Sequence, residues 1–192
     1  RVLFRSTPEG HTARPTRLNN LALALHDRYR RDGNPADLDT AITHHQAAVD
    51  ATPEGHTDRP ALLSNLALAL TGRYRRDGDP ADLDTAISTY QAAIDITPPR
   101  STNRLARLHN LAGALQARFA RRRDVADAIA TVACRLEVLA SPTAPWALTL
   151  DTGRALQRFI RHLALPGLPS SVTAQLMRAF PLGPDEHSPS TK

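Results

Sequence analysis

Leucine, alanine and occasional aromatic residues recur every three or four positions along most of the chain, which is the spacing of amphipathic helices that each bury one face. Within residues 52–96, the first apolar stripe comprises Leu63, Leu66, Ala67, Leu70 and Tyr74. The second stripe comprises Leu83, Ala86, Ile87, Tyr90, Ala93 and Ile94. Two amphipathic helices are therefore predicted in this stretch, with polar residues on their outer faces.

Residues that start and stop helices delimit both predicted segments. Thr57 or Asp58 is placed to cap the first helix, and Gly78 is placed to end it in a left-handed turn. Asp79 is the expected N-cap of the second helix, Pro80 occupies its first turn, and the following Thr-Pro pair stops it. The two helices, called A and B below, should span roughly 19 and roughly 16 residues.

This arrangement repeats with a period of 45 residues. Residues 7–51 and 52–96 are identical at 33 of 45 positions, and a diverged third copy occupies residues 97–140. A fixed period in this range is typical of solenoids, in which each unit buries its apolar face by stacking on its neighbours. In the third copy, helix A carries its stripe at Leu105, Leu108, Leu111, Ala112, Leu115 and Phe119. Its helix B is predicted to bury Val125, Ile129, Val132, Leu136 and Leu139.

The two ends of the chain depart from the repeat. Residues 1–6 match it poorly and are set aside as a truncated or non-native leader. Residues 141–180 are predicted to form a degenerate repeat or capping helices, with Trp146 packed under the cap. Residues 181–192 have the composition of a disordered tail.

The alternation of large and small residues resembles that of the tetratricopeptide repeat (TPR). In the second unit the resemblance rests on Leu63, Leu66, Ala67, Leu70, Ala86, Tyr90, Ala93 and Pro98. In the first unit it rests on Leu18, Leu21, Ala22, Leu25, Ala41, His45, Ala48 and Pro53. The usual repeat has about 34 residues, and the longer unit is similar to the repeats of kinesin light chains and of actinobacterial signalling proteins that accompany CHAT peptidases. The resemblance implies an all-α, right-handed solenoid of helical hairpins with a C-terminal capping helix.

The same resemblance implies a binding surface, because helix A of the TPR family lines a concave groove that holds an extended peptide. Asn20, Asn65 and Asn110 occupy one helix A position in all three units. In repeats of the kinesin-light-chain type, an asparagine here contacts the ligand backbone. Asparagine is a mediocre helix former, and its amide offers both a donor and an acceptor. The alternative is that these amides bond to the next helix or face water.

Positions beside the asparagines are candidates for reading ligand side chains. The two near-identical units differ at positions 16, 19, 26 and 27 relative to 61, 64, 71 and 72, and helical spacing places these positions beside the asparagines. Neutral drift outside the core is the alternative explanation. The candidate specificity residues are Asn19, His26, Asp27, Ser64, Thr71, His109 and Gln116.

Charge and composition change this interpretation little. The net charge is +5 and the pI about 10.3, but the arginines are interleaved with aspartates, which favours a solvated face over a nucleic-acid interface. The dense run Arg121–Arg123 leaves open an alternative, a basic surface for nucleic acid or an acidic partner. No apolar run is long enough for a membrane span, and a single cysteine fits a reducing, cytoplasmic setting.

The sequence offers no arrangement for catalysis or metal binding. The eight histidines lack the spacing of metal ligands, no phosphate-binding loop is present, and Cys134 lies in an apolar-periodic helix as an inert thiol. We therefore expect no catalytic residue, no cofactor and no metal, and predict a scaffold that binds a partner protein or peptide. An alternative is a regulatory region of a larger signalling protein, its CHAT peptidase or nucleotide-binding switch being absent here. The sequence leaves the oligomeric state open.

Overall fold

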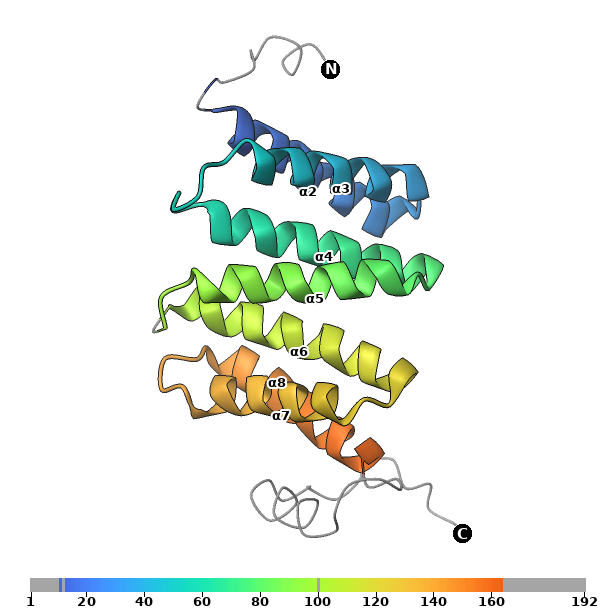
Figure 1. The fold of residues 1–192 in the computed structure, drawn as a ribbon, viewed down its shortest axis with the longest axis vertical. Coiled ribbons are helices and arrows are strands. Elements are labelled where there is room, and N and C mark those ends of the chain that lie inside the picture. The colour runs from blue at the N-terminus through green and yellow to red at the C-terminus, as the bar shows by residue number, and fades with distance from the viewer. Residues whose placement is uncertain (1–10, 12, 100, 164–192) are drawn as a thin grey trace. The chain divides into compact units, whose positions relative to one another are not determined.

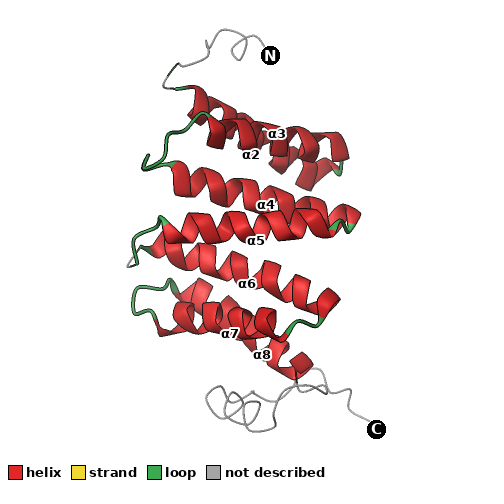
Figure 2. Cartoon of the chain, viewed as in Figure 1, coloured by secondary structure: helices red, strands yellow, loops and turns green. Residues whose placement is uncertain are grey.

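The computed structural model describes residues 11, 13–99 and 101–163, and every regular element among them is an α-helix (Figures 1 and 2). The seven helices of this part of the chain are α2 (Arg14–Asp32), α3 (Pro35–Asp50), α4 (Arg59–Asp77), α5 (Pro80–Asp95), α6 (Thr102–Arg122), α7 (Val125–Ala140) and α8 (Trp146–Leu163). Helices α2, α4 and α6 are the A helices, and α3, α5 and α7 are the B helices. The predicted lengths are confirmed in the second unit, where α4 has 19 residues and α5 has 16.

The turn between helices A and B follows the predicted chemistry. Gly33 and Gly78 have φ angles of 74° and 76°, a left-handed conformation that glycine adopts without steric cost. Asn34 and Asp79 then cap the B helices, since each side chain accepts a hydrogen bond from the backbone N–H two residues on, at 3.1 and 2.9 Å. The roles predicted for Gly78 and Asp79 are thereby confirmed.

The start of helix A is capped by a residue that sequence reasoning did not choose. Asp58 occupies the N-cap position of α4, but its side chain makes no capping hydrogen bond. The Nδ1 atom of His56 instead accepts a hydrogen bond from the backbone N–H of Asp58, at 3.2 Å. His11 makes the equivalent contact with the N–H of Ala13, at 3.1 Å. The histidines of the two TPEGHT turns therefore fix the starts of α2 and α4.

The third unit keeps the geometry of the repeat with different residues. Arg123 takes the place of the turn glycine with a φ of 58°, and Asp124 caps α7. The predicted buried face of α7 is wrong in part, because Val125 is exposed and Ile129 is 62% exposed. Helix α7 instead buries Asp127, Ala128, Thr131, Arg135 and Val138. These positions match the buried ones of α5, so α7 keeps the register of the repeat rather than that of its own apolar residues.

Each A helix packs against the following B helix as an antiparallel hairpin, and the hairpins stack in chain order (Figure 1). Helix α3 contacts α4, and α5 contacts α6. The A helices also contact one another in sequence, α2 with α4 and α4 with α6, whereas the B helices of the described part make no comparable contact with each other. Fully buried alanines allow this close packing at Ala22, Ala41, Ala48, Ala67, Ala69, Ala86, Ala93, Ala112 and Ala114.

The chain divides into two compact units on either side of the Ala144–Pro145 bond, and α8 belongs to the second. Trp146, in the first turn of α8, is 78% exposed, so the prediction that it packs under a cap is wrong. The residue lies six positions before the buried Thr152, which places it about 120° away from the buried face of its helix. The predicted leader (1–6), the tail (181–192) and residues 164–180 lie outside the described residues.

Among the described helices, none combines the length and the apolar character needed to cross a membrane.

Candidate functional site

The three repeated asparagines lie on the A helices in different environments. Asn20 of α2 is exposed, whereas Asn65 of α4 and Asn110 of α6 are half-buried. The Nδ2 atom of Asn65 donates a hydrogen bond to Oδ1 of Asn19 on the neighbouring helix, at 3.0 Å. The side chains of Asn20 and Asn110 make no hydrogen bond within the described part of the chain. Asn65 therefore bonds to a neighbouring helix, which was the alternative to a ligand contact, whereas Asn20 and Asn110 have no such bond among the described residues.

Exposed leucines lie one turn beyond these asparagines. Leu23 and Leu68 are both exposed, at equivalent positions of α2 and α4. The equivalent residue of α6 is Gly113, and a Cβ atom built there would meet no other atom within 4 Å. Because successive A helices contact one another, this surface, which we call the A face, presents two apolar side chains and then an open space above Gly113.

A cleft of about 450 Å³ opens where the N-terminal parts of α2 and α4 meet. Its walls include Thr16, Asn19 and Ala61, which come from two of the repeat positions at which the first two units differ. His11 and His56 also line it. Because Nδ1 of each ring accepts a backbone N–H, the neutral ring carries its proton on Nε2 and offers a hydrogen-bond donor.

The remaining candidate residues divide between the surface and the interior. Asp27 is exposed, and Ser64 and His109 are half-buried. Thr71 is only 5% exposed, and its hydroxyl donates to the carbonyl oxygen of Ala67 at 2.8 Å.

Thr71, Gln116 and His26 were predicted to contact ligand side chains. In the structure, this position of helix A instead faces the B helix of its own hairpin. Thr71 also hydrogen-bonds with the buried Tyr90. In the third unit, the equivalent residue Gln116 accepts a hydrogen bond from Arg135 at 2.5 Å. His26 acts to lower the pKa of His45, which occupies in α3 the position that Tyr90 occupies in α5. Variation at this helix A position is therefore matched by variation at the helix B position it meets, and these three residues are left out of the A face.

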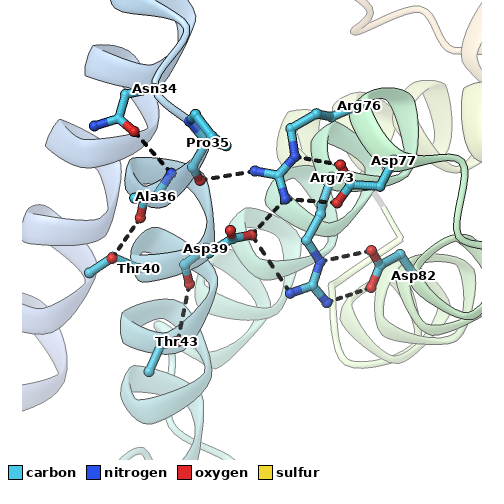
Figure 3. Close-up of polar contacts among 10 residues, drawn as sticks. All are labelled: Asn34, Pro35, Ala36, Asp39, Thr40, Thr43, Arg73, Arg76, Asp77 and Asp82. Atoms are coloured by element: carbon cyan, nitrogen blue, oxygen red, sulfur yellow. Dashed lines mark hydrogen bonds and ion pairs between the residues drawn. The ribbon is translucent and has the colours of Figure 1, made fainter.

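A second repeated arrangement was missed by sequence reasoning, although its spacing is visible in the sequence. An arginine of each A helix pairs with a buried aspartate at the start of the following B helix: Arg28 with Asp37, Arg73 with Asp82 and Arg118 with Asp127. In the second hairpin, Arg73 reaches both carboxylate oxygens of Asp82, at 2.7 and 2.5 Å (Figure 3). In the first, hydrogen bonds from Arg28 lower the pKa of Asp37. These arginines and aspartates recur at the 45-residue period, and this recurrence could have revealed the pairs from the sequence.

Further ion pairs join one hairpin to the next. Asp39 of α3 accepts a hydrogen bond from Arg76 of α4 at 2.8 Å and lies 4.0 Å from Arg73, as Figure 3 shows. Arg76 also donates to the carbonyl oxygen of Pro35, at 2.9 Å. This contact lies at the end of the hairpins where each A helix turns into its B helix.

The next junction uses the equivalent aspartate. Asp84 of α5 accepts hydrogen bonds from Arg118 and Arg122 of α6, at 3.1 and 2.7 Å. Burial acts to raise the pKa of Asp84, but the two arginines outweigh it, and the net shift is downward. The position of Asp39 and Asp84 is occupied in the third unit by Ile129, which ends the series.

The basic run Arg121–Arg123 is committed to contacts within the protein. Arg121 donates to the carbonyl oxygen of Gly78 at 3.3 Å, and Arg122 pairs with Asp84. The guanidinium carbon of Arg123 lies 5.8 Å from the ring centre of Phe119. Each arginine of the run thus makes a contact with the described part of the protein, and Arg122 makes its contact with a carboxylate.

Reactive and metal-binding groups are sparse in the described residues. Cys134 is half-buried, and burial raises the pKa of its thiol to about 11, which disfavours the nucleophilic thiolate. Within residues 11, 13–99 and 101–163, no three histidine, cysteine or carboxylate side chains gather as a metal site would require.

No model of a known protein family matches the chain. No curated protein sequence is significantly similar to it either.

Proposed function

We propose that the chain is a binding scaffold whose A face holds an extended peptide segment of a partner protein. The observation that carries this proposal is the A face itself. It combines the amides of Asn20 and Asn110, which have no hydrogen-bond partner among the described residues, with the exposed leucines Leu23 and Leu68 on neighbouring helices. An extended peptide needs both, since its backbone is recognised by side-chain amides and its alternate side chains by apolar contacts.

The curvature expected of such a scaffold agrees with the contacts between hairpins. Successive A helices touch each other while successive B helices of the described part do not do so comparably, which supports an arrangement with the A helices on the inner side of a curved stack. We propose on this basis that the hairpins belong to a right-handed solenoid of TPR type. The cleft between α2 and α4 then lies at one end of the inner surface and takes one ligand side chain.

A peptide selection tests this proposal. A random 12-residue peptide library would be selected on the immobilised chain, and the enriched peptides measured by fluorescence anisotropy against Asn20→Ala/Asn110→Ala. Loss of two hydrogen bonds worth about 0.5–1.5 kcal/mol each should weaken binding roughly tenfold, with no comparable change in melting temperature. Gln91→Ala, on an exposed face of α5, is the matched control and should bind as the parent does.

Two results would speak against the A face. Enriched peptides that bind the double variant as tightly as the parent would place the site elsewhere. A selection that enriches no peptide over the bare support would remove the proposed activity itself. An affinity that collapses between 50 and 200 mM salt, beyond what neutral hydrogen bonds allow, would instead favour the basic-surface alternative.

A further inference from the structure

One interior position of each hairpin is occupied by a polar pair, and the chemistry of the pair differs in every unit. In the second hairpin it is Thr71 with Tyr90, and in the third Gln116 with Arg135, both joined by hydrogen bonds. In the first hairpin the equivalent residues are His26 and His45. The first two units are otherwise so similar that this pair is the main interior difference between their hairpins.

The first pair differs in that both polar atoms of its buried member lack a hydrogen-bond partner. His45 is 0% exposed, and neither Nδ1 nor Nε2 of its ring has a hydrogen-bond partner. Tyr90, at the same place in the second hairpin, is also fully buried but its hydroxyl is bonded. A buried imidazole without partners can remain only in its neutral form, because adding a proton would place an uncompensated charge in the core.

The groups around His45 reinforce this preference. His26 of α2 and His44 of its own helix α3 both act to lower the pKa of His45, after the larger effect of burial. Burial and then Arg30 lower the pKa of His26 itself, against a smaller opposing effect of Asp27. Helix α4, the other helix packed on α3, brings Gly72 close to His26 and contributes no charge that acts on His45. Among the described residues, no carboxylate acts to raise the pKa of His45.

We infer that the pair of the buried His45 and the half-buried His26 makes the first hairpin an acid-sensitive element, which opens in mild acid while the second hairpin stays closed. Opening releases His45 to water, where it takes up a proton freely. Helix α2 carries Asn20 and one wall of the cleft, so opening would also dismantle one end of the A face. The inference itself does not depend on the proposed function.

The expected size of the effect follows from proton linkage. The pKa of His45 is about 4 in the closed hairpin, against an ordinary value of 6.5 once it is open. The folded value is lowered, so the stabilisation is complete above pH 6.5 and is lost as the pH falls toward 4. The opening equilibrium should therefore rise roughly 20-fold between pH 7 and pH 5, a range in which carboxylates stay ionised.

Hydrogen exchange read by mass spectrometry tests the inference on the full chain. Exchange of peptides from α2–α3 and from α4–α5 would be compared at pH 7 and pH 5, after correction for the intrinsic chemical rate. We expect the α2–α3 peptides to lose protection roughly 20-fold relative to the α4–α5 peptides. Equal changes in the two hairpins of the unmodified chain would overturn the inference without any variant.

Exchanging the pairs between hairpins supplies the matched variants. His26→Thr/His45→Tyr installs the bonded pair of the second hairpin in the first and should abolish the acid effect there. Thr71→His/Tyr90→His is the reciprocal change and should transfer the effect to α4–α5. His44→Thr, which copies Thr89 of the second unit, is the control and should leave most of the effect in place. An acid response that survives the first exchange would assign it to other groups and reject the pair.

Discussion

Some side chains of this protein are predicted from the sequence to lie on the surface but lie between helices in the structure. Thr71 and Gln116 were assigned to the binding surface because they lie near the asparagines in helical spacing. In the structure both side chains point toward helix B of their own hairpin. Thr71 bonds there with Tyr90, and Gln116 with Arg135. Each partner lies 19 residues further along the chain, so no local pattern distinguishes this inward position from the exposed ones beside it.

The bond between Thr71 and Tyr90 gives a testable consequence at this scale. Burial raises the pKa of Tyr90 to about 12, and its hydroxyl is inside the hairpin. Tyr90→Phe should therefore destabilise the chain by about 1 kcal/mol, measured by urea denaturation. Tyr74→Phe is the control, since no hydrogen bond of its hydroxyl joins it to the described residues, and it should be nearly neutral. Equal effects of the two changes would contradict the described bond.

The helices themselves follow from local chemistry. Gly78 and Asp79 marked the A–B turn in the sequence because the left-handed turn and the N-cap depend on neighbouring backbone atoms alone. The buried face of α7 could not be found in the same way. Its apolar residues Val125 and Ile129 point outward, because the Arg118–Asp127 pair and the stacking of the hairpins fix its rotation.

Two glycines of α4 and its turn should respond in opposite directions. Gly78→Ala places a Cβ atom on a residue with φ of 76° and should cost about 1 kcal/mol. Gly72→Ala lies inside the helix, and its Cβ would be 3.7 Å from the Leu38 side chain, an ordinary contact. It should stabilise the chain by up to about 1 kcal/mol in urea denaturation. A loss of stability at Gly72 as large as that at Gly78 would mean that α4 packs more tightly on α3 than described.

At the scale of the stacked hairpins, ion pairs join each hairpin to the next. Arg76 and Asp39 join the first two hairpins, and Arg118, Arg122 and Asp84 join the second and third. The alternation of arginine and aspartate in the sequence predicts a solvated face. It does not by itself show that certain arginines and aspartates, which recur every 45 residues, form pairs. The period and helices were thus predictable, whereas the pairing of charges required knowing which helix ends meet.

Removing one of these linking carboxylates should weaken the stack. Asp84→Asn loses two charged partners on α6 and should cost about 1 kcal/mol in urea at low salt, with a smaller loss in 1 M NaCl because salt screens exposed pairs. Asp95→Asn is the matched control, because within the described residues the Asp95 side chain bonds to Gln91 of its own helix and to no other hairpin. A salt-independent loss, or an equal loss in the control, would show that the link is not electrostatic.

The same carboxylates should govern unfolding at low pH. Hydrogen bonds from arginine lower the pKa of Asp37 and of Asp77, and the net shift of Asp84 is also downward. Lowered values mean that their stabilisation is complete above the ordinary pKa of 3.8 and disappears as the pH falls below it. Melting temperature should therefore drop again below pH 4, after the histidine effect is exhausted. A melting temperature that stays level between pH 4 and pH 2.5 would contradict this.

Residues 52–96 carry complementary charges on the two sides that contact neighbouring hairpins. Arg76 faces an aspartate of the preceding hairpin, and Asp84 faces arginines of the following one. A copy of this segment inserted after residue 96 would bring Arg76 of the copy against Asp84 of the original, reproducing the charge pair of the present junction. Longer concatemers of this one segment would thus keep that charge pair at every junction, while Ile129 marks where such an extension cannot simply continue.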